Sequence, residues 1–195
     1  MPPRPAVFLD RDGTLNVEVN YLHRVQDFAW IPGAVDAVGR LNRAGLPVVV
    51  ITNQAAVAHG YCEEADVLRI HQHMAGELRA AGAWIDAFYY CTSHPRARVE
   101  ALRRDDPRRK PGTGMFEEAL RDWDADPAAS WMVGDRGTDL EPAARLGMRT
   151  ILVETGYGAA EKAHVRADHV VPDLPAAVDL ILRAPNREQG IGNRE

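Results

Sequence analysis

The sequence predicts an α/β fold built around a parallel sheet. Short apolar runs alternate along the chain with amphipathic patterns of helical period, and this alternation is typical of parallel α/β sheets. The runs at residues 7–9 and 46–51 are almost wholly apolar, as strands buried on both faces should be. The 195 residues, 46% hydrophobic and 26% charged, suit one globular domain. We expect that domain over residues 1–184 and a flexible polar tail over 185–195.

The elements are expected in a regular order. Each helix follows an apolar stripe of helical spacing, and glycines such as Gly45 and Gly82 mark where two of the helices end. The expected strands are residues 7–9, 46–51, 85–91, 130–135, 149–153 and 169–171. The expected helices lie between them, at residues 33–45, 63–82, 112–123, 140–146 and 174–182. Residues 16–28 are expected to form an ordered loop over the strand ends, and residues 92–110 a long irregular segment.

Composition excludes several classes of protein. No apolar stretch approaches the ~20 residues that a membrane helix needs. The net charge of −5 argues against general nucleic-acid binding. The two cysteines, Cys62 and Cys91, make no disulfide framework, so a reducing cytoplasm is the expected location. The few residues before the first strand leave no room for a secretory signal. We expect a monomer without a membrane or nucleic-acid partner.

The most informative stretch is Asp-x-Asp-Gly-Thr at residues 10–14, directly after the first apolar run. The carboxyl ends of parallel strands are where such sheets bind ligands. Asp10 and Asp12 could share Mg²⁺, a hard cation that prefers oxygen ligands, and an ionised carboxylate there could attack phosphorus to form an aspartyl-phosphate. An acidic turn after a strand is the plainer alternative for Asp-x-Asp alone. The full motif makes that alternative unconvincing.

Three further segments place polar groups at strand ends or at a helix start. Thr52 and Asn53 follow the second strand, Lys110 precedes a helix, and Asp135 and Asp139 follow the fourth strand. Singly, each has an ordinary structural explanation, such as a capped turn or a solvated lysine. Together and in this order they supply what phosphoryl transfer needs, namely a metal site, phosphate-binding groups and a cation near the transferring group.

This order of motifs resembles the haloacid dehalogenase superfamily of phosphatases. The finer resemblance is to its histidinol-phosphate and heptose-bisphosphate phosphatase branch, and it covers residues 6 to about 182. It rests on the stretches Phe8-Leu9-Asp10-Arg11-Asp12-Gly13-Thr14-Leu15-Asn16, Ile51-Thr52-Asn53-Gln54, Tyr89-Tyr90-Cys91, Arg109-Lys110-Pro111 and Trp131-Met132-Val133-Gly134-Asp135. The resemblance implies a Rossmann-like three-layer sandwich with a central parallel sheet, a minimal cap and a small phosphorylated sugar as substrate.

The resemblance also implies roles for individual residues. Asp10 would be the nucleophile and Asp12 the general acid and base. Mg²⁺ would be bound by the Asp10 side chain, the Asp12 backbone carbonyl and Asp135, with Asp139 in support. Thr52, Asn53 and Lys110 would hold the transferring phosphate, with Gln54 beside them. Arg109 would grip a remote phosphate, and the loop from Glu18 to Tyr21 would touch the substrate.

The sequence departs from this branch in two places. Members commonly hold a structural zinc through Cys-x-His and Cys-x-Cys before the Arg-Lys-Pro motif. Here Cys91 is followed by Ser93 at the histidine position, and Asp106 and Arg108 stand at the later cysteine positions. One thiolate with an adjacent imidazole cannot make a closed four-ligand site, so we expect no structural zinc. His59 stands where the heptose enzymes usually have arginine, which weakens the assignment of one particular sugar.

Several functions remain open at this point. The leading expectation is a Mg²⁺-dependent phosphoric monoester hydrolase that removes the 7-phosphate of D-glycero-D-manno-heptose 1,7-bisphosphate. Histidinol phosphate is the alternative substrate, although its cation would meet Arg109. A module that binds phosphate ligands without catalysis should have lost Asp10 or Asp12, and both are present. A phosphotransferase would need a substantial cap to exclude water, and no insertion is long enough to form one.

Overall fold

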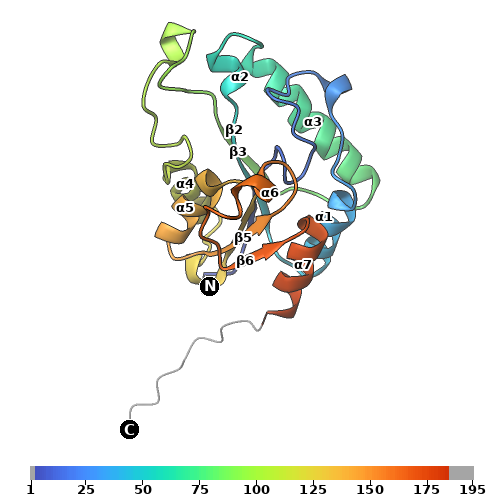
Figure 1. Ribbon diagram of the computed structural model, residues 1–195. Helices are drawn as coiled ribbons and strands as arrows, with labels where there is room; N and C mark the ends of the chain where they lie inside the picture. Colours follow the sequence, from blue (N-terminus) through green and yellow to red (C-terminus); the bar gives the residue numbers. More distant parts are fainter. Residues whose placement is uncertain (1–2, 185–195) are drawn as a thin grey trace.

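A single parallel sheet forms the centre of the protein, for which the computed structural model describes residues 3–184 (Figure 1). The strand order is β3-β2-β1-β4-β5-β6, and every neighbouring pair is parallel. The strands are β1 (Val7–Leu9), β2 (Val48–Asn53), β3 (Ala87–Cys91), β4 (Trp131–Gly134), β5 (Arg149–Val153) and β6 (His169–Val171). The predicted α/β class is therefore confirmed. The tail expected over residues 185–195 lies outside the described residues.

In the described part, six α-helices connect the strands and a seventh follows β6. They are α1 (Ala34–Arg43), α2 (Ala55–Ala58), α3 (Glu64–Ala80), α4 (Gly114–Asp122), α5 (Gly137–Arg145), α6 (Gly158–Glu161) and α7 (Leu174–Arg183). The short helices α2 and α6 escaped the sequence prediction because one turn is too short to show a period. Helix α5 begins earlier than expected, because the Asp139 carboxylate accepts a hydrogen bond from the Arg136 N–H at 3.0 Å and so caps the first turn.

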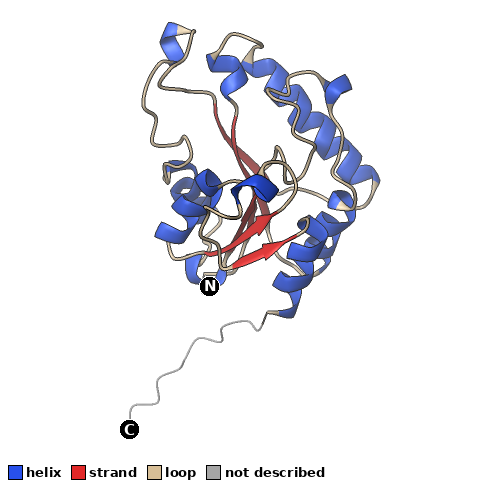
Figure 2. Cartoon of the chain, viewed as in Figure 1, coloured by secondary structure: helices blue, strands red, loops and turns tan. Residues whose placement is uncertain are grey.

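Helices cover both faces of the sheet and give three layers (Figure 2). Side chains alternate between the faces along each strand. Val7 and Leu9 pack with buried residues of α1, α3 and α7, whereas Phe8 packs with those of α4 and α5. The strands are thus buried on both sides, which is why their sequences are apolar throughout rather than alternating. The Rossmann-like three-layer sandwich is confirmed.

The first strand lies at the centre of the sheet, between β2 and β4. Leu9 pairs with Val50 on one side and with Val133 on the other. The chain runs outward from β1 in both directions, so the gap between β1 and β4 is the switch point where such sheets bind ligands. The Asp10 N–H donates to the Val133 carbonyl at 2.9 Å. This bond places Asp10 beside Asp135, which directly follows β4.

Two irregular segments rise above this edge of the sheet. The loop over residues 16–28 is tied down where Asn16 bridges to Trp30 and where Leu22 is buried in the core. The segment over residues 92–110 contains one 3-10 turn, Glu100–Leu102. The segment ends at Arg109 and Lys110, so its conformation decides where these two cations lie. Together the two loops form the minimal cap that was expected.

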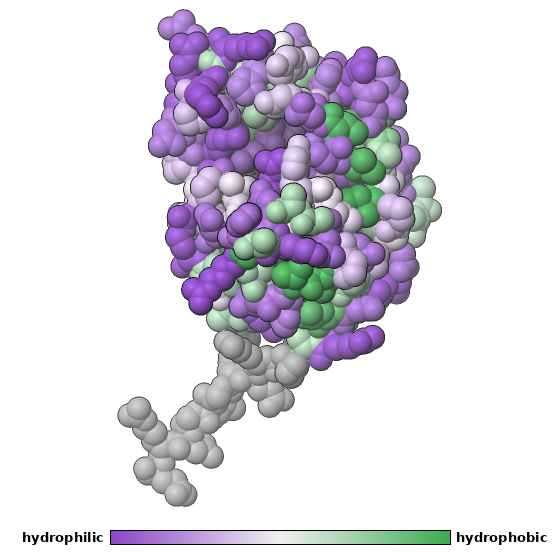
Figure 3. All heavy atoms as spheres, viewed as in Figure 1, coloured by the Kyte–Doolittle hydropathy of each residue, from purple (hydrophilic) through white to green (hydrophobic). Residues whose placement is uncertain are grey.

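The face of the molecule seen in Figure 3 differs in polarity from end to end. Hydrophilic residues dominate the end that carries the two loops, and hydrophobic residues gather near β6 and α7, where Val170 and Leu182 are exposed. None of the helices in the part of the chain that the structure describes is both long and apolar enough to cross a membrane.

Candidate active site

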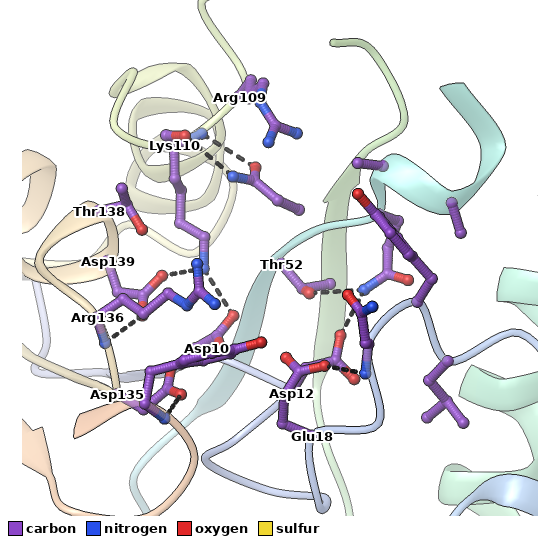
Figure 4. Close-up of a pocket in the computed structure, with 18 of the residues that line it drawn as sticks. Asp10, Asp12, Glu18, Thr52, Arg109, Lys110, Asp135, Arg136, Thr138 and Asp139 are labelled. Carbon is purple, nitrogen blue, oxygen red and sulfur yellow. Dashed lines mark hydrogen bonds and ion pairs between the residues drawn. The ribbon is translucent and has the colours of Figure 1, made fainter. Parts of the chain in front are cut away.

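A polar pocket of about 260 Å³ opens above the carboxyl ends of the strands. It contains every site residue that the sequence predicted: Asp10, Asp12, Glu18, Tyr21, Thr52, Asn53, Gln54, Arg109, Lys110, Asp135 and Asp139. Figure 4 shows most of these side chains converging from β1, β2, the start of α4 and the start of α5. The convergence expected from the motif order is therefore present in the fold.

A buried ammonium group sits at the centre of the pocket. Lys110 Nζ lies 2.7 Å from Asp10 Oδ1 and 2.7 Å from Asp139 Oδ1. It also donates to the Ile51 carbonyl at 2.7 Å, so all three of its donors are used. The Lys110 side chain is only 2% exposed, and a buried ammonium needs such partners because its hydration is lost. These contacts join the segment of Lys110 to three others that are distant in sequence.

The backbone of Lys110 is fixed as firmly as its side chain. Asn53 donates from Nδ2 to the Lys110 carbonyl at 3.0 Å and accepts from the Lys110 N–H at 3.1 Å. This reciprocal pair attaches the end of the irregular segment to the end of β2. Asn53 therefore positions the lysine, in addition to lining the pocket.

The two carboxylates that contact the Lys110 ammonium group belong to a cluster of three. Oxygens of Asp10, Asp135 and Asp139 lie within 4.8 Å of one another, and all three residues are buried. Asp135 Oδ2 accepts a hydrogen bond from the Tyr157 N–H, whereas the buried Oδ1 has no hydrogen-bond partner among the described residues. An unpartnered carboxylate oxygen among other carboxylates suits a hard divalent cation. The donor set therefore fits a metal ion.

Burial and mutual repulsion perturb these carboxyl groups in the metal-free protein. Burial raises the pKa of Asp10 to about 7, with the charge of Lys110 opposing the rise and that of Asp139 adding to it. Burial and the charges of Asp10 and Asp139 raise the pKa of Asp135 to about 8. A bound divalent cation would favour both ionised forms and reverse these shifts.

Two glycines make room for the Asp135 carboxylate. Gly13 and Gly156 both have positive φ, and a Cβ atom on either would lie about 2 Å from Asp135 Oδ2. A side chain at these positions would therefore displace a carboxylate of the candidate metal site. The glycine of the Asp-x-Asp-Gly-Thr motif is needed for this close approach as well as for its turn.

The Asp12 carboxylate is held apart from the carboxylates of Asp10, Asp135 and Asp139. Arg11 contacts it through Nη2 at 2.7 Å, and Asn16 and Gln54 donate to it at 2.9 Å each. Burial raises the pKa of Asp12, but the Arg11 guanidinium and these hydrogen bonds outweigh burial, and the net pKa is lowered. Arg11 is itself fully buried, and its Nη1 lies 3.4 Å from Nε2 of His71.

His71 explains how a fully buried arginine is accommodated. Burial and the nearby Arg11 charge lower the pKa of His71 to about 3, so the imidazole is neutral and can accept from the guanidinium. Its ring stacks on Phe88 at a centroid distance of 4.4 Å. His71 is buried, and no pattern in the sequence indicates its contact with Arg11.

The outer part of the pocket is cationic and aromatic. Arg109 is half-buried, and its guanidinium donates to the Ser93 carbonyl at 3.3 Å. Tyr21 contacts the rings of His59 and Tyr61, and His59 in turn contacts His94. His59 itself supports the rim through these contacts. Sequence reasoning missed several residues that line the pocket, chief among them His94, Arg136, Thr138 and Tyr157, whereas Asn20 belongs to the predicted loop from Glu18 to Tyr21.

Arg136 is the most informative of the missed residues. Its guanidinium lies 3.5 Å above the centre of the Tyr157 ring, and Figure 4 shows it extending over the carboxylates. Its position directly after Asp135 was a usable signal, because the residue that begins a helix at a strand end faces the ligand edge. Tyr157 gave no such signal, since the loop after β5 carries none of the motifs.

Comparisons with known proteins agree with this arrangement. The HAD-hydrolase-like family profile matches residues 107–177. The D-glycero-beta-D-manno-heptose-1,7-bisphosphate 7-phosphatase of Escherichia coli O6:H1 is 40% identical, over 89% of this chain and 94% of its own length. The D-glycero-D-manno-heptose-1,7-bisphosphate 7-phosphatase of Thermosynechococcus vestitus is 44% identical, over 92% and 96%.

A solved structure extends the likeness to three dimensions. The crystal structure of D,D-heptose 1,7-bisphosphate phosphatase from B. bronchiseptica, complexed with magnesium and phosphate, superposes with a TM-score of 0.81. It is 32% identical in sequence and covers 91% of this chain and 98% of its own. The fold is that of a haloacid dehalogenase-like hydrolase. Within this class, the chain belongs to the family of the heptose-bisphosphate phosphatases.

The raised pKa values predict how the metal-free protein responds to pH. Asp10 and Asp135 ionise near pH 4 when unfolded but near 7 and 8 when folded. The folded state therefore binds more protons in between, and its stability falls as pH rises through that window. Between about pH 6.5 and 8.5 the thermal midpoint of chelator-treated protein should fall by several degrees, at about 2–4 °C per kcal/mol. Mg²⁺ should remove most of that fall.

The Asp135→Asn variant is the control for this measurement. The variant loses one of the two perturbed carboxyl groups, so its midpoint should change less over the same pH range. The neutral His71 has only a small effect of opposite sign there, because most of its contribution to stability changes below its unfolded pKa of 6.5. Equal falls in both proteins, with or without Mg²⁺, would contradict the assignment of the metal site.

Proposed function

We propose that the protein is a Mg²⁺-dependent phosphatase that hydrolyses the 7-phosphate of D-glycero-D-manno-heptose 1,7-bisphosphate. The names and full-length similarity of the relatives support the substrate. The observation that carries the chemistry is the Asp10–Lys110 contact at 2.7 Å beside two further buried carboxylates. It combines a nucleophile, a cation for the transferring group and a metal site at one edge of the sheet.

The first half of the proposed reaction transfers the phosphoryl group to the protein. An Asp10 carboxylate oxygen attacks phosphorus, the bond from phosphorus to the sugar oxygen breaks, and the Asp12 carboxyl gives its proton to the leaving alkoxide. Asp12 must be protonated for this step, although Arg11 favours its ionised form in the free protein. The negative charge of an incoming phosphate raises the pKa of a neighbouring carboxyl group, and so favours the acid form when substrate binds.

The second half releases phosphate. The ionised Asp12 takes a proton from water, the water oxygen attacks phosphorus, and the acyl-phosphate bond to Asp10 breaks. Asp12 then carries the proton needed for the next turnover. Its hydrogen bonds to Asn16 and Gln54 keep the carboxylate over the reacting atoms in both steps.

Binding groups surround the position of the transferring phosphate. Thr52 and Lys110 lie on its β2 and α4 sides, and Gln54 bonds to both Thr52 and Asp12. Asn53 holds the lysine backbone. Mg²⁺ would be held by the Asp10 side chain, the Asp12 backbone carbonyl and Asp135, with Asp139 in support. Its charge would neutralise phosphate and carboxylate oxygens together.

Arg109 favours a substrate with two phosphates. Its guanidinium lines the pocket and is half-buried, which lowers its pKa through lost hydration. Among residues 3–184 no carboxylate forms an ion pair with it. A half-buried cation without an acidic partner is a natural site for a ligand anion. The imidazole and amine of histidinol phosphate would offer no anion there. Glu18 and Tyr21 line the same rim and would contact the sugar.

The setting that we propose is a monomer acting in the cytoplasm on a small sugar phosphate. Thiols at Cys62 and Cys91 are both free, which suits a reducing compartment. The pocket is small and acidic at its base, and a nucleic-acid strand would be poorly matched to it.

The direct test of function is phosphate release in Mg²⁺ from both anomers of heptose 1,7-bisphosphate and from histidinol phosphate. We expect a kcat/KM of about 10⁴ M⁻¹s⁻¹ or more on one heptose anomer, and at least tenfold less on histidinol phosphate. Asp10→Asn is the control for contaminating activity and should release no phosphate. A preference for histidinol phosphate would overturn the proposed substrate and leave the catalytic residues in place.

Removing Arg109 tests the second phosphate contact. Arg109→Ala should raise the KM for heptose 1,7-bisphosphate by about 10- to 100-fold, since a charged hydrogen bond contributes about 1.5–3 kcal/mol. Heptose 7-phosphate, which lacks the remote phosphate, should be affected less than about threefold. Arg79→Ala, at an exposed arginine on α3, is the matched control for the loss of charge. Equal effects of Arg109→Ala on the two substrates would refute the role.

A further inference from the structure

The segment over residues 92–110 must be held in one conformation for Arg109 to reach the pocket. It is mostly irregular, yet it ends at Arg109 and Lys110, whose positions decide the shape of the pocket. Lys110 is fixed by Asn53, Asp10 and Asp139, but none of these residues contacts the Arg109 side chain. Something within the segment must hold Arg109, because a long loop without regular structure is otherwise free to vary.

The residues at the expected zinc positions do not fit a zinc ion. Cys91, Ser93, Asp106 and Arg108 offer one thiol, one hydroxyl, one carboxylate and a guanidinium. A guanidinium has no lone pair for a metal, and structural zinc needs four sulfur, nitrogen or carboxylate donors. Among the described residues, the one cluster of three or more potential metal ligands is Asp10, Asp135 and Asp139 in the pocket.

The Asp106 carboxylate occupies the centre of this region instead. Its Oδ1 accepts from the Arg108 N–H at 3.0 Å and its Oδ2 from Arg104 Nε at 3.2 Å. The Ser93 hydroxyl is a third donor. Burial raises the pKa of Asp106, but the hydrogen bonds from Arg108, Ser93 and Arg104 outweigh it and lower the net pKa. The carboxylate is therefore ionised at neutral pH and joins the start of the segment to its end.

Asp106 and Ser93 also hold Arg109. The Arg109 N–H donates to the backbone carbonyl of Asp106 at 2.9 Å. Its guanidinium donates through Nη1 to the backbone carbonyl of Ser93 at 3.3 Å. Ser93 is 1% exposed and the Asp106 side chain 11%, so both anchors are shielded from water. Figure 4 shows the Arg109 side chain at the mouth of the pocket, where these bonds place it.

We propose that Asp106 is a positioning residue that orders residues 92–110 without a metal and thereby holds Arg109 over the substrate. Its hydrogen bonds with Ser93, Arg104 and the Arg108 backbone take the place of the metal–ligand bonds expected in this branch. The effect on substrate affinity rests on the proposed function, whereas the ordering of the segment is independent of it. Asp106 touches neither the substrate nor the metal site, so it acts on binding through Arg109.

Asp106→Ala tests the proposal, with Asp105→Ala as the matched control. Asp105 is exposed and has no side-chain partner among the described residues, so both variants lose one adjacent negative charge. We expect Asp106→Ala to speed amide hydrogen exchange in residues 92–110 and to raise the KM for heptose 1,7-bisphosphate by about 10- to 100-fold, as misplaced binding groups do. The kcat, and the KM for heptose 7-phosphate, should stay within about twofold of wild type.

Asp106→Asn keeps one acceptor oxygen without the charge. Its hydrogen-exchange rate in residues 92–110 and its KM for heptose 1,7-bisphosphate should fall between those of wild type and Asp106→Ala. Exchange and KM values equal to those of Asp105→Ala would overturn the proposal. A similar rise in KM for both substrates would also overturn it, because Arg109 would then not be what is displaced. If wild type fails to hydrolyse the bisphosphate, the proposed function fails, and hydrogen exchange alone decides the role of Asp106.

Zinc itself provides the second test. Wild-type protein treated with a strong chelator and returned to Mg²⁺ alone should show unchanged exchange in residues 92–110 and contain less than a tenth of a zinc ion per chain by elemental analysis. One tightly bound zinc per chain, whose removal speeds exchange in this segment, would overturn the proposal.

Discussion

The contact of the buried Lys110 ammonium with Asp10 and Asp139 is the constraint on which the rest of the site depends. The fold brings three carboxylates within 4.8 Å of one another and supplies one buried cation among them. Their repulsion and burial explain why the pKa values of Asp10 and Asp135 are raised. The metal-free site thus has more negative charge than Lys110 alone balances. A divalent cation would balance the excess and would also attract a phosphate group.

The architecture of the sheet makes this arrangement possible. The central position of β1 places Asp10 between the end of β2 and the end of β4. Gly13 and Gly156 allow the Asp135 carboxylate to approach closely, and Asn53 fixes the lysine backbone. The proposed nucleophile Asp10 and the carboxylate of Asp135 therefore directly follow the central strands β1 and β4, whereas Arg109 is carried by the loop over residues 92–110. The division suits an enzyme whose chemistry is fixed and whose substrate preference depends on loop contacts.

The sequence predicted most of the fold and the inner part of the pocket because both depend on local patterns. Apolar runs locate the strands, and parallel strands bring their carboxyl ends together, so Asp10, Lys110 and Asp135 could be expected to meet. The contact of Arg11 with His71 and the hydrogen bond of Asp106 with Ser93 join segments with no shared motif. They arise from tertiary packing, which the hydrophobic periodicity of the sequence does not reveal. The sequence shows that residues 92–110 lack the usual four zinc ligands, but it does not indicate the hydrogen bonds that the Asp106 carboxylate accepts there.

The most direct test of the account is to identify the residue that carries the phosphoryl group during turnover. Asp12→Asn loses the general acid of the first step and the general base of the second, and each loss should slow its step by about 10²–10⁴-fold. With heptose 1,7-bisphosphate the phosphoenzyme should therefore form slowly but also persist, so that acid quenching late in the reaction traps it. Peptide mass spectrometry should then find one added phosphoryl group on Asp10, and none in Asp10→Asn. A phosphoryl group on another residue, or continued slow turnover without any phosphorylated Asp10, would contradict nucleophilic catalysis by Asp10.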